Sequence, residues 1–143
     1  MNINNIINKT LDFTVKRIAE LTGTLLIILS ILLLISLISY SPEDPNFIFP
    51  DNTEIRNILG FRGSFVSDLF FQSIGLVSVL VAITIFFTGI NLFRTKKFIF
   101  IIENLFYTVL YSVLGSLFFS TYHPNSFWLI NNGNGGFIGK FLQ

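Results

Sequence analysis

The sequence predicts an all-α membrane protein, a polytopic transmembrane helix bundle with three complete spans and the start of a fourth. Hydrophobic residues make up 52% of the chain and charged residues only 12%, a composition that excludes a disordered chain and is unusual for a soluble domain. Long apolar segments cover residues 21–41, 69–93 and 98–122. Each can cross about 30 Å of hydrocarbon as a helix rising about 1.5 Å per residue. The lipid bilayer is therefore the first expected partner of the chain.

Residues 1–20 are predicted to form a cytoplasmic amphipathic helix that leads into the first span. Apolar residues recur there at spacings of three and four, with polar residues between them. Two placements fit this pattern. The helix lies flat in the headgroup region, where Lys16 and Arg17 meet anionic lipid, or it is a solvent-exposed extension of the span.

The segment Ser41-Pro42-Glu43-Asp44-Pro45 is predicted to end the first span. Proline donates no backbone hydrogen bond and disfavours helical geometry in the residue before it, and carboxylates are costly inside hydrocarbon. Residues 42–68 then form a polar loop with five acidic residues and two arginines. Within it, a turn is predicted at residues 50–52 and a short helix from about Thr53 to Gly60.

Two sets of small residues predict close helix packing. Gly75, Ala82 and Gly89 recur every seven residues in the second span, which would place them on one face of a helix. The third span repeats small hydroxyl residues every fourth position, with a glycine beside them: Thr108, Ser112, Ser116, Ser120 and Gly115. The alternatives are a ligand groove at the first set and a polar permeation path at the second.

The last hydrophobic segment, about residues 135–143, is predicted to be the start of a fourth span. It follows the glycine- and asparagine-rich run 131–136 and is too short to cross a bilayer alone. A tail that touches the membrane is the alternative.

The basic residues predict the orientation of the spans. Lys9, Lys16 and Arg17 precede the first span, and Arg94, Lys96 and Lys97 separate the second from the third. Because Lys and Arg near span ends favour the cytoplasmic side, the N-terminus is expected inside and loop 42–68 outside.

No catalytic, cofactor or metal site is predicted. The single histidine, His123, has no neighbouring carboxylate in the sequence, and Gly139-Lys140 lacks the hydroxyl residue of a phosphate-binding loop. Glu103, the acid within the third span, lies close enough to Lys96 and Lys97 to pair with a basic residue or reach the headgroups. A proton relay at Glu103 is the alternative.

Three motifs in order resemble the N-terminal membrane domain of the FtsK/SpoIIIE DNA translocases. The first is the proline-rich end of span one, the second opens the next span, and the third resembles the family's entry to its fourth span. The matching positions are Pro42, Asp44 and Pro45; Gly60, Gly63, Asp68 and Gly75; and Gly135, Gly136 and Gly139. The resemblance covers nearly all of the chain from Leu21 onward, and it assigns these positions a structural role.

The resemblance implies a membrane anchor that targets a DNA translocase to the division septum of a bacterial inner membrane. It also implies divisome membrane proteins as partners, homo-oligomerisation, and contact with DNA only through a C-terminal motor absent from these residues. The chain itself is then not an enzyme and needs no cofactor. The alternative function is a small channel or transporter subunit that uses the stripe from Thr108 to Ser120.

Overall fold

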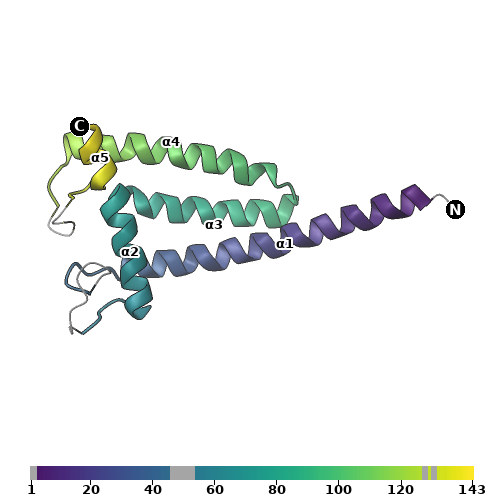
Figure 1. Ribbon diagram of the computed structural model, residues 1–143, viewed down its shortest axis with the longest axis horizontal. Helices are drawn as coiled ribbons and strands as arrows, with labels where there is room; N and C mark the ends of the chain where they lie inside the picture. The colour runs from purple at the N-terminus through teal and green to yellow at the C-terminus, as the bar shows by residue number, and fades with distance from the viewer. Residues whose placement is uncertain (1–2, 46–53, 127–128, 130–131) are drawn as a thin grey trace.

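The computed structural model describes residues 3–45, 54–126, 129 and 132–143, and every regular element in that part of the chain is an α-helix. The helices are α1 (Ile3–Ile38), α2 (Gly60–Ile74), α3 (Val77–Thr95), α4 (Ile99–Tyr122) and α5 (Gly136–Leu142). In Figure 1, α1, α3 and α4 run lengthwise with α3 in the middle, α2 lies across one end, and α5 lies beside that end of α4. The predicted all-α fold is confirmed.

Among the described residues, three helices are long and apolar enough to cross a membrane, over Ile7–Ile38, Val77–Thr95 and Ile99–Tyr122. We call the end of the bundle where Lys96 joins α3 to α4 the turn end. We call the opposite end the loop end; it holds α2, α5 and the connections that follow α1 and α4 (Figure 1). The chain is therefore a membrane helix bundle in which a short turn joins α3 to α4 at one end, while two further helices and the longer connections lie at the other end.

Helix α1 joins the predicted lead-in and the predicted first span into one helix of 36 residues. No proline interrupts it, and its apolar residues continue across Glu20 at helical spacing. The lead-in and the first span are thus one continuous helix in the structure. The helix ends at Ile38, where the backbone N–H groups of Ser39 and Tyr40 still donate to the carbonyls of Ile35 and Leu37, at 3.1 and 3.3 Å.

The predicted second span, residues 69–93, is corrected by the structure. A corner at Gly75 and Leu76 divides this segment between α2 and α3, and Gly75 has a φ of +62°. A run of uncharged residues reveals length and polarity, but it carries no signal for a change of direction. The loop predicted over residues 42–68 is also shorter in the structure, because α2 begins at Gly60.

The connection before α2 also differs from the prediction. Residues 54–59 are not helical, although a short helix was expected there. Thr53, its predicted cap, and the turn predicted at residues 50–52 lie outside the described residues. A buried cluster underlies this end of the bundle and consists of Leu33, Leu37, Tyr40, Phe71, Ala82 and Leu129.

Helices α1 and α3 form the most extensive helix pair, and two glycines set their separation. A β carbon placed on Gly23 would lie 2.8 Å from the carbonyl oxygen of Gly89, and one placed on Gly89 would lie 2.8 Å from that of Gly23. Side chains larger than hydrogen therefore cannot occupy the crossing without separating the helices. Gly89 and Ala82 lie on this side of α3, whereas Gly75 belongs to the corner and not to the same helix face.

We predict that Gly89→Leu lowers the stability of the bundle by about 1–3 kcal/mol, because an inserted side chain overpacks the α1–α3 crossing. Thermal unfolding in detergent, followed by circular dichroism, measures the change. The matched control is Phe87→Leu, two residues away on α3, where 57% of the side chain is exposed. Equal melting temperatures for the two variants would show that the glycine contact does not hold the pair together.

Candidate functional site at the loop end

The carboxylate of Asp44 fastens the chain that returns to α2 against the end of α1. It accepts hydrogen bonds from the backbone N–H groups of Arg56 and Asn57, at 2.8 and 2.9 Å. Only 6% of Asp44 is exposed. A buried carboxylate is tolerated when several donors compensate for its lost hydration, and backbone N–H groups do so here. Pro42 and Pro45, on either side, keep this segment out of a helix.

The side chain of Asn57 caps the C-terminal end of α1. Its side-chain amide nitrogen donates to the carbonyls of Ser36 and Ser39, at 2.9 and 3.3 Å, and its amide oxygen accepts from the N–H of Leu59 at 3.1 Å. The last carbonyls of a helix have no partner within the helix, so a buried helix end needs donors from elsewhere. With 4% exposure, Asn57 supplies them out of reach of solvent.

The glycines of the second motif allow α2 to approach this polar assembly. Gly60 has a φ of +65° and donates its N–H to the carbonyl of Asn57 at 2.8 Å, which forms the turn into α2. A β carbon at Gly63 would overlap the side chain of Asn57. The carbonyl of Gly63 also accepts the hydroxyl of Ser36 at 2.6 Å. The first two motifs are therefore parts of one structure.

Asp68 on α2 forms hydrogen bonds with Tyr40, which follows α1, and with Gln72 on α2. One carboxylate oxygen accepts from the hydroxyl of Tyr40 and from the amide of Gln72, both at 3.3 Å. Burial, together with the neighbouring Asp68 charge, raises the pKa of Tyr40 to about 12, so the phenol keeps its proton and remains a donor. Gln72 in turn accepts from the amide of Asn132 at 2.8 Å.

The third motif packs into the corner between α2 and α3. The N–H of Leu76 donates to the carbonyl of Asn134 at 2.9 Å, and a β carbon at Gly75 would overlap that same carbonyl. Gly136, with a φ of +65°, lies against the backbone of Gly75 and Ile74. Because two backbones meet here without side chains between them, glycine is required on each.

Helix α4 packs against the third motif through the C-terminal part of its small-residue stripe. β carbons at Gly135 and Gly139 would overlap Ser116 and Ser120, and the hydroxyl of Ser116 donates to the carbonyl of Ile74 at 3.0 Å. Ser112, Ser116 and Ser120 are all buried. The stripe is thus a packing surface against α5 and the end of α2.

The remaining stripe residues also serve packing, which leaves the channel alternative unfavoured. The hydroxyl of Thr108 donates to its own helix at Asn104, at 2.6 Å, and Gly115 faces the side chain of Val77. The amide of Asn104 donates to Thr88 on α3 at 2.7 Å. Around Thr108, the groove between the helices has an almost wholly apolar exposed surface, which does not favour a polar path at this part of the stripe.

Of the other residues considered from the sequence, His123 touches this assembly only through its backbone carbonyl, which accepts from the side-chain amide of Asn134 at 2.9 Å. Glu103 is exposed on α4, and His123 caps α4 by donating its N–H to the carbonyl of Phe119 at 2.9 Å. Within the part of the chain that the structure describes, no group of three acidic, histidine or cysteine side chains could hold a metal ion.

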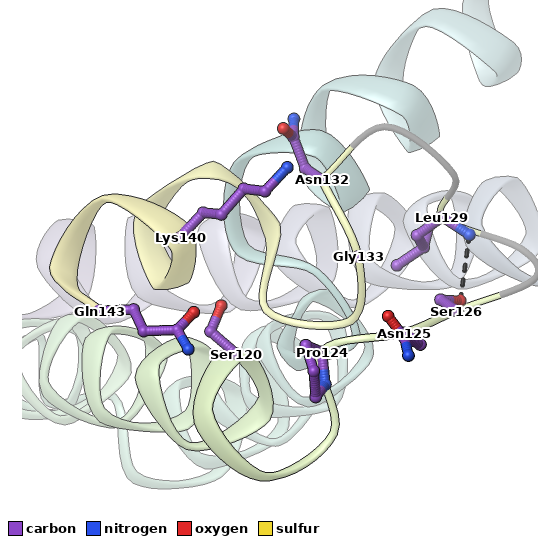
Figure 2. Close-up of a pocket in the computed structure, with 9 residues that line it drawn as sticks. All are labelled: Ser120, Pro124, Asn125, Ser126, Leu129, Asn132, Gly133, Lys140 and Gln143. Atoms are coloured by element: carbon purple, nitrogen blue, oxygen red, sulfur yellow. Dashed lines mark hydrogen bonds between the residues drawn. The ribbon is translucent and has the colours of Figure 1, made fainter.

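A polar hollow of about 240 Å³ opens at the loop end beside α5. Figure 2 shows Lys140 reaching from α5 toward Asn132, while the N–H of Leu129 donates to the hydroxyl of Ser126 at 3.1 Å. Most side chains that line the hollow carry a hydroxyl, an amide or an ammonium group. The lining residues are Ser120, Pro124, Asn125, Ser126, Leu129, Asn132, Gly133, Lys140 and Gln143. Such a lining offers hydrogen bonds to a polar partner outside the hydrocarbon.

Sequence reasoning missed Asn57, Gln72, Asn132 and Asn134. An asparagine in a polar loop has no signature that separates a buried cap from a solvated side chain. Gly23 was also missed, although a lone glycine in a leucine-rich span was an available signal of close helix packing.

We predict that Asp44→Ala destabilises the bundle by about 1–3 kcal/mol, because it leaves the buried N–H of Asn57 and the partly buried N–H of Arg56 without their acceptor. Thermal unfolding in detergent measures this cost. The neighbouring Glu43→Ala is the control, since Glu43 forms an ion pair of 2.8 Å with Arg56 while 69% of its side chain is exposed. That change is expected to stay within about 0.5 kcal/mol. A similar loss from both variants would contradict the proposed role of Asp44.

Comparison with known proteins identifies the chain at the level of a family. Residues 15–143 match the family model described as the 4TM region of DNA translocase FtsK/SpoIIIE. The chain is 29% identical over 130 residues to the DNA translocase FtsK of Rhizobium meliloti (strain 1021), and 30% identical over 127 residues to that of Bradyrhizobium diazoefficiens. A third relative, from Agrobacterium fabrum (strain C58), is 25% identical over 130 residues.

These alignments cover 91%, 89% and 91% of the chain, but only 15% of each relative. The match is to the transmembrane region and not to the motor. No solved structure gives a significant match. The three motifs fall within the matched residues, and the chain belongs to the family of the FtsK/SpoIIIE 4TM region.

Proposed function

We propose that this chain is the membrane-anchoring and septum-targeting domain of a bacterial DNA translocase that acts in cell division and chromosome segregation. The observation that carries the proposal is the convergence of the three motifs at the loop end of an FtsK-family helix bundle. Asp44, Asn57 and Asp68 fix that end through buried or partly buried hydrogen bonds. A surface held so firmly is suited to recognition by other proteins, since little ordering is needed on binding.

The distribution of charge supports an inner-membrane location with the N-terminus in the cytoplasm. Of the nine basic residues, six lie in the N-terminal part of α1 or at the turn end. The remaining three, Arg56, Arg62 and Lys140, lie at the loop end. Lys96 and Glu20 form an ion pair of 2.5 Å, which brings the two basic groups to the same level of the bundle. The positive-inside tendency then places the turn end in the cytoplasm and the loop end in the periplasm.

The loop end is accordingly the face offered to divisome membrane proteins in this proposal. Ile58 is 74% exposed on the connection between α1 and α2, while its N–H is held by the hydroxyl of Ser39 at 3.2 Å. An exposed apolar side chain on a fixed backbone is typical of the centre of a recognition surface. The chain itself carries no catalytic site and takes no cofactor, and DNA is contacted by the motor elsewhere in the translocase.

Labelling of single cysteines tests the orientation, because the chain has no cysteine of its own. Glu54→Cys is expected to react with a membrane-impermeant maleimide in spheroplasts, since it lies at the loop end. Thr95→Cys, at the turn end, is expected to react only after the membrane is permeabilised. Reaction of Thr95→Cys from outside would reverse the orientation.

An anchor exchange in the full translocase tests septal targeting. Residues 1–143 are replaced by an unrelated multispan anchor that keeps the motor in the cytoplasm, and a fluorescent tag reports location. The exchanged protein is expected to stay in the membrane fraction and to lose its enrichment at the septum. Ile58→Glu in the natural anchor should reduce the same enrichment, whereas the control Ile58→Leu should retain it. Full septal enrichment of the exchanged protein would refute targeting by this domain.

A further inference from the structure

Helix α1 continues well past the turn end of the bundle, where no other described helix accompanies it (Figure 1). The ion pair between Glu20 and Lys96 marks the level at which α3 ends. Residues 3–19 lie beyond this level and span about 25 Å at about 1.5 Å per residue. The candidate span within α1 has 32 residues, whereas about 20 suffice to cross a bilayer. A sizeable part of α1 therefore stands outside the hydrocarbon.

One face of this extension is an apolar stripe with coiled-coil spacing. Its members follow each other at alternating steps of four and three, and we call them the α1 stripe: Ile7, Leu11, Thr14, Ile18, Leu21 and Leu25. The five apolar members are between 50% and 73% exposed. Steps of four and three average 3.5 residues, the repeat with which two helices keep the same faces in contact.

Beyond the turn end, the opposite face of α1 is polar. From the turn end toward the loop end, that face packs on α3. Lys16 and Asp12 pair at 2.6 Å, Glu20 pairs with Lys96, and Gly23 meets Gly89. Since these contacts lie on the far side of the helix from the α1 stripe, the stripe points away from the bundle. Nothing else in the described residues covers it.

We propose that the α1 stripe is the contact through which copies of this chain associate, as a parallel coiled coil that begins beyond the membrane and continues into it. Copies of one membrane protein share one orientation, so their α1 helices are parallel and present the same stripe to each other. The stripe contains no charged residue that would oppose like copies. A flat position on the membrane surface would require a bend near Glu20, and α1 passes Glu20 unbroken.

This inference rests on the membrane location of the chain and is independent of septal targeting. It also provides a partner, the same stripe of another copy, for the exposed apolar residues outside the hydrocarbon. Burial of a leucine or isoleucine side chain is worth about 1.5–3 kcal/mol, so several such positions in register stabilise an association. Thr14, the one polar member, donates its hydroxyl to the carbonyl of Thr10 in its own helix at 2.9 Å, so this group needs no partner from the other copy.

Single-cysteine crosslinking of the 143-residue chain in native membranes tests the proposal. Leu11→Cys and Ile18→Cys lie in the α1 stripe, and Lys9→Cys and Lys16→Cys are matched controls on the opposite face at similar depth. Mild oxidation should give about tenfold more disulfide-linked dimer from the stripe positions, because core side chains of parallel helices face their counterparts. Adding Leu11→Glu to Ile18→Cys should abolish that crosslink, while Lys9→Glu should not.

Each other outcome overturns the proposal. Equal dimer yields from both faces would indicate random collision. Absence of dimer at the stripe, with its cysteines shielded from a water-soluble maleimide, would place the stripe on lipid or on a different protein. Septal localisation measured in the same strains separates this result from the fate of the targeting proposal.

Discussion

The buried carboxylate of Asp44 is the interaction on which the loop end depends. A membrane helix satisfies its own backbone except at its ends, and α1 ends beneath other chain segments instead of in open water. Asp44 accepts the N–H groups of Arg56 and Asn57, and Asn57 then donates to the carbonyls that α1 leaves without partners. Two side chains thus join the end of one helix to the start of the next.

From that junction the order of the remaining elements follows. With the chain held at Asn57, Gly60 turns it into α2, and α2 lies across the bundle until Gly75 redirects it into α3. Asn134 and Gly136 fill the corner from the other side, supported by Ser116 of α4. Motifs that are separated by tens of residues in the sequence therefore form one continuous set of contacts.

The features visible in the sequence are those that depend on local polarity. Apolar length predicted the helices around Leu26, Ala82 and Ser112, and Pro42 predicted the end of the first one within a few residues. The corner at Gly75 could not be predicted, because the carbonyl of Asn134 that occupies the glycine's open side is about 60 residues away. The role of Asn57 was hidden for the same reason, since capping of α1 is a long-range contact. Local patterns specify elements, whereas these contacts specify how the elements meet.

Hydrogen exchange of single backbone amides tests the central role of Asp44 most directly. The N–H groups of Arg56 and Asn57 lie in a connection without regular secondary structure, where amides bonded only to water exchange quickly. Measured by NMR on the chain in detergent micelles, both amides should exchange slowly in the natural sequence and quickly in Asp44→Ala, while helical amides of α3 remain protected. Rapid exchange of both amides in the natural sequence would contradict the account.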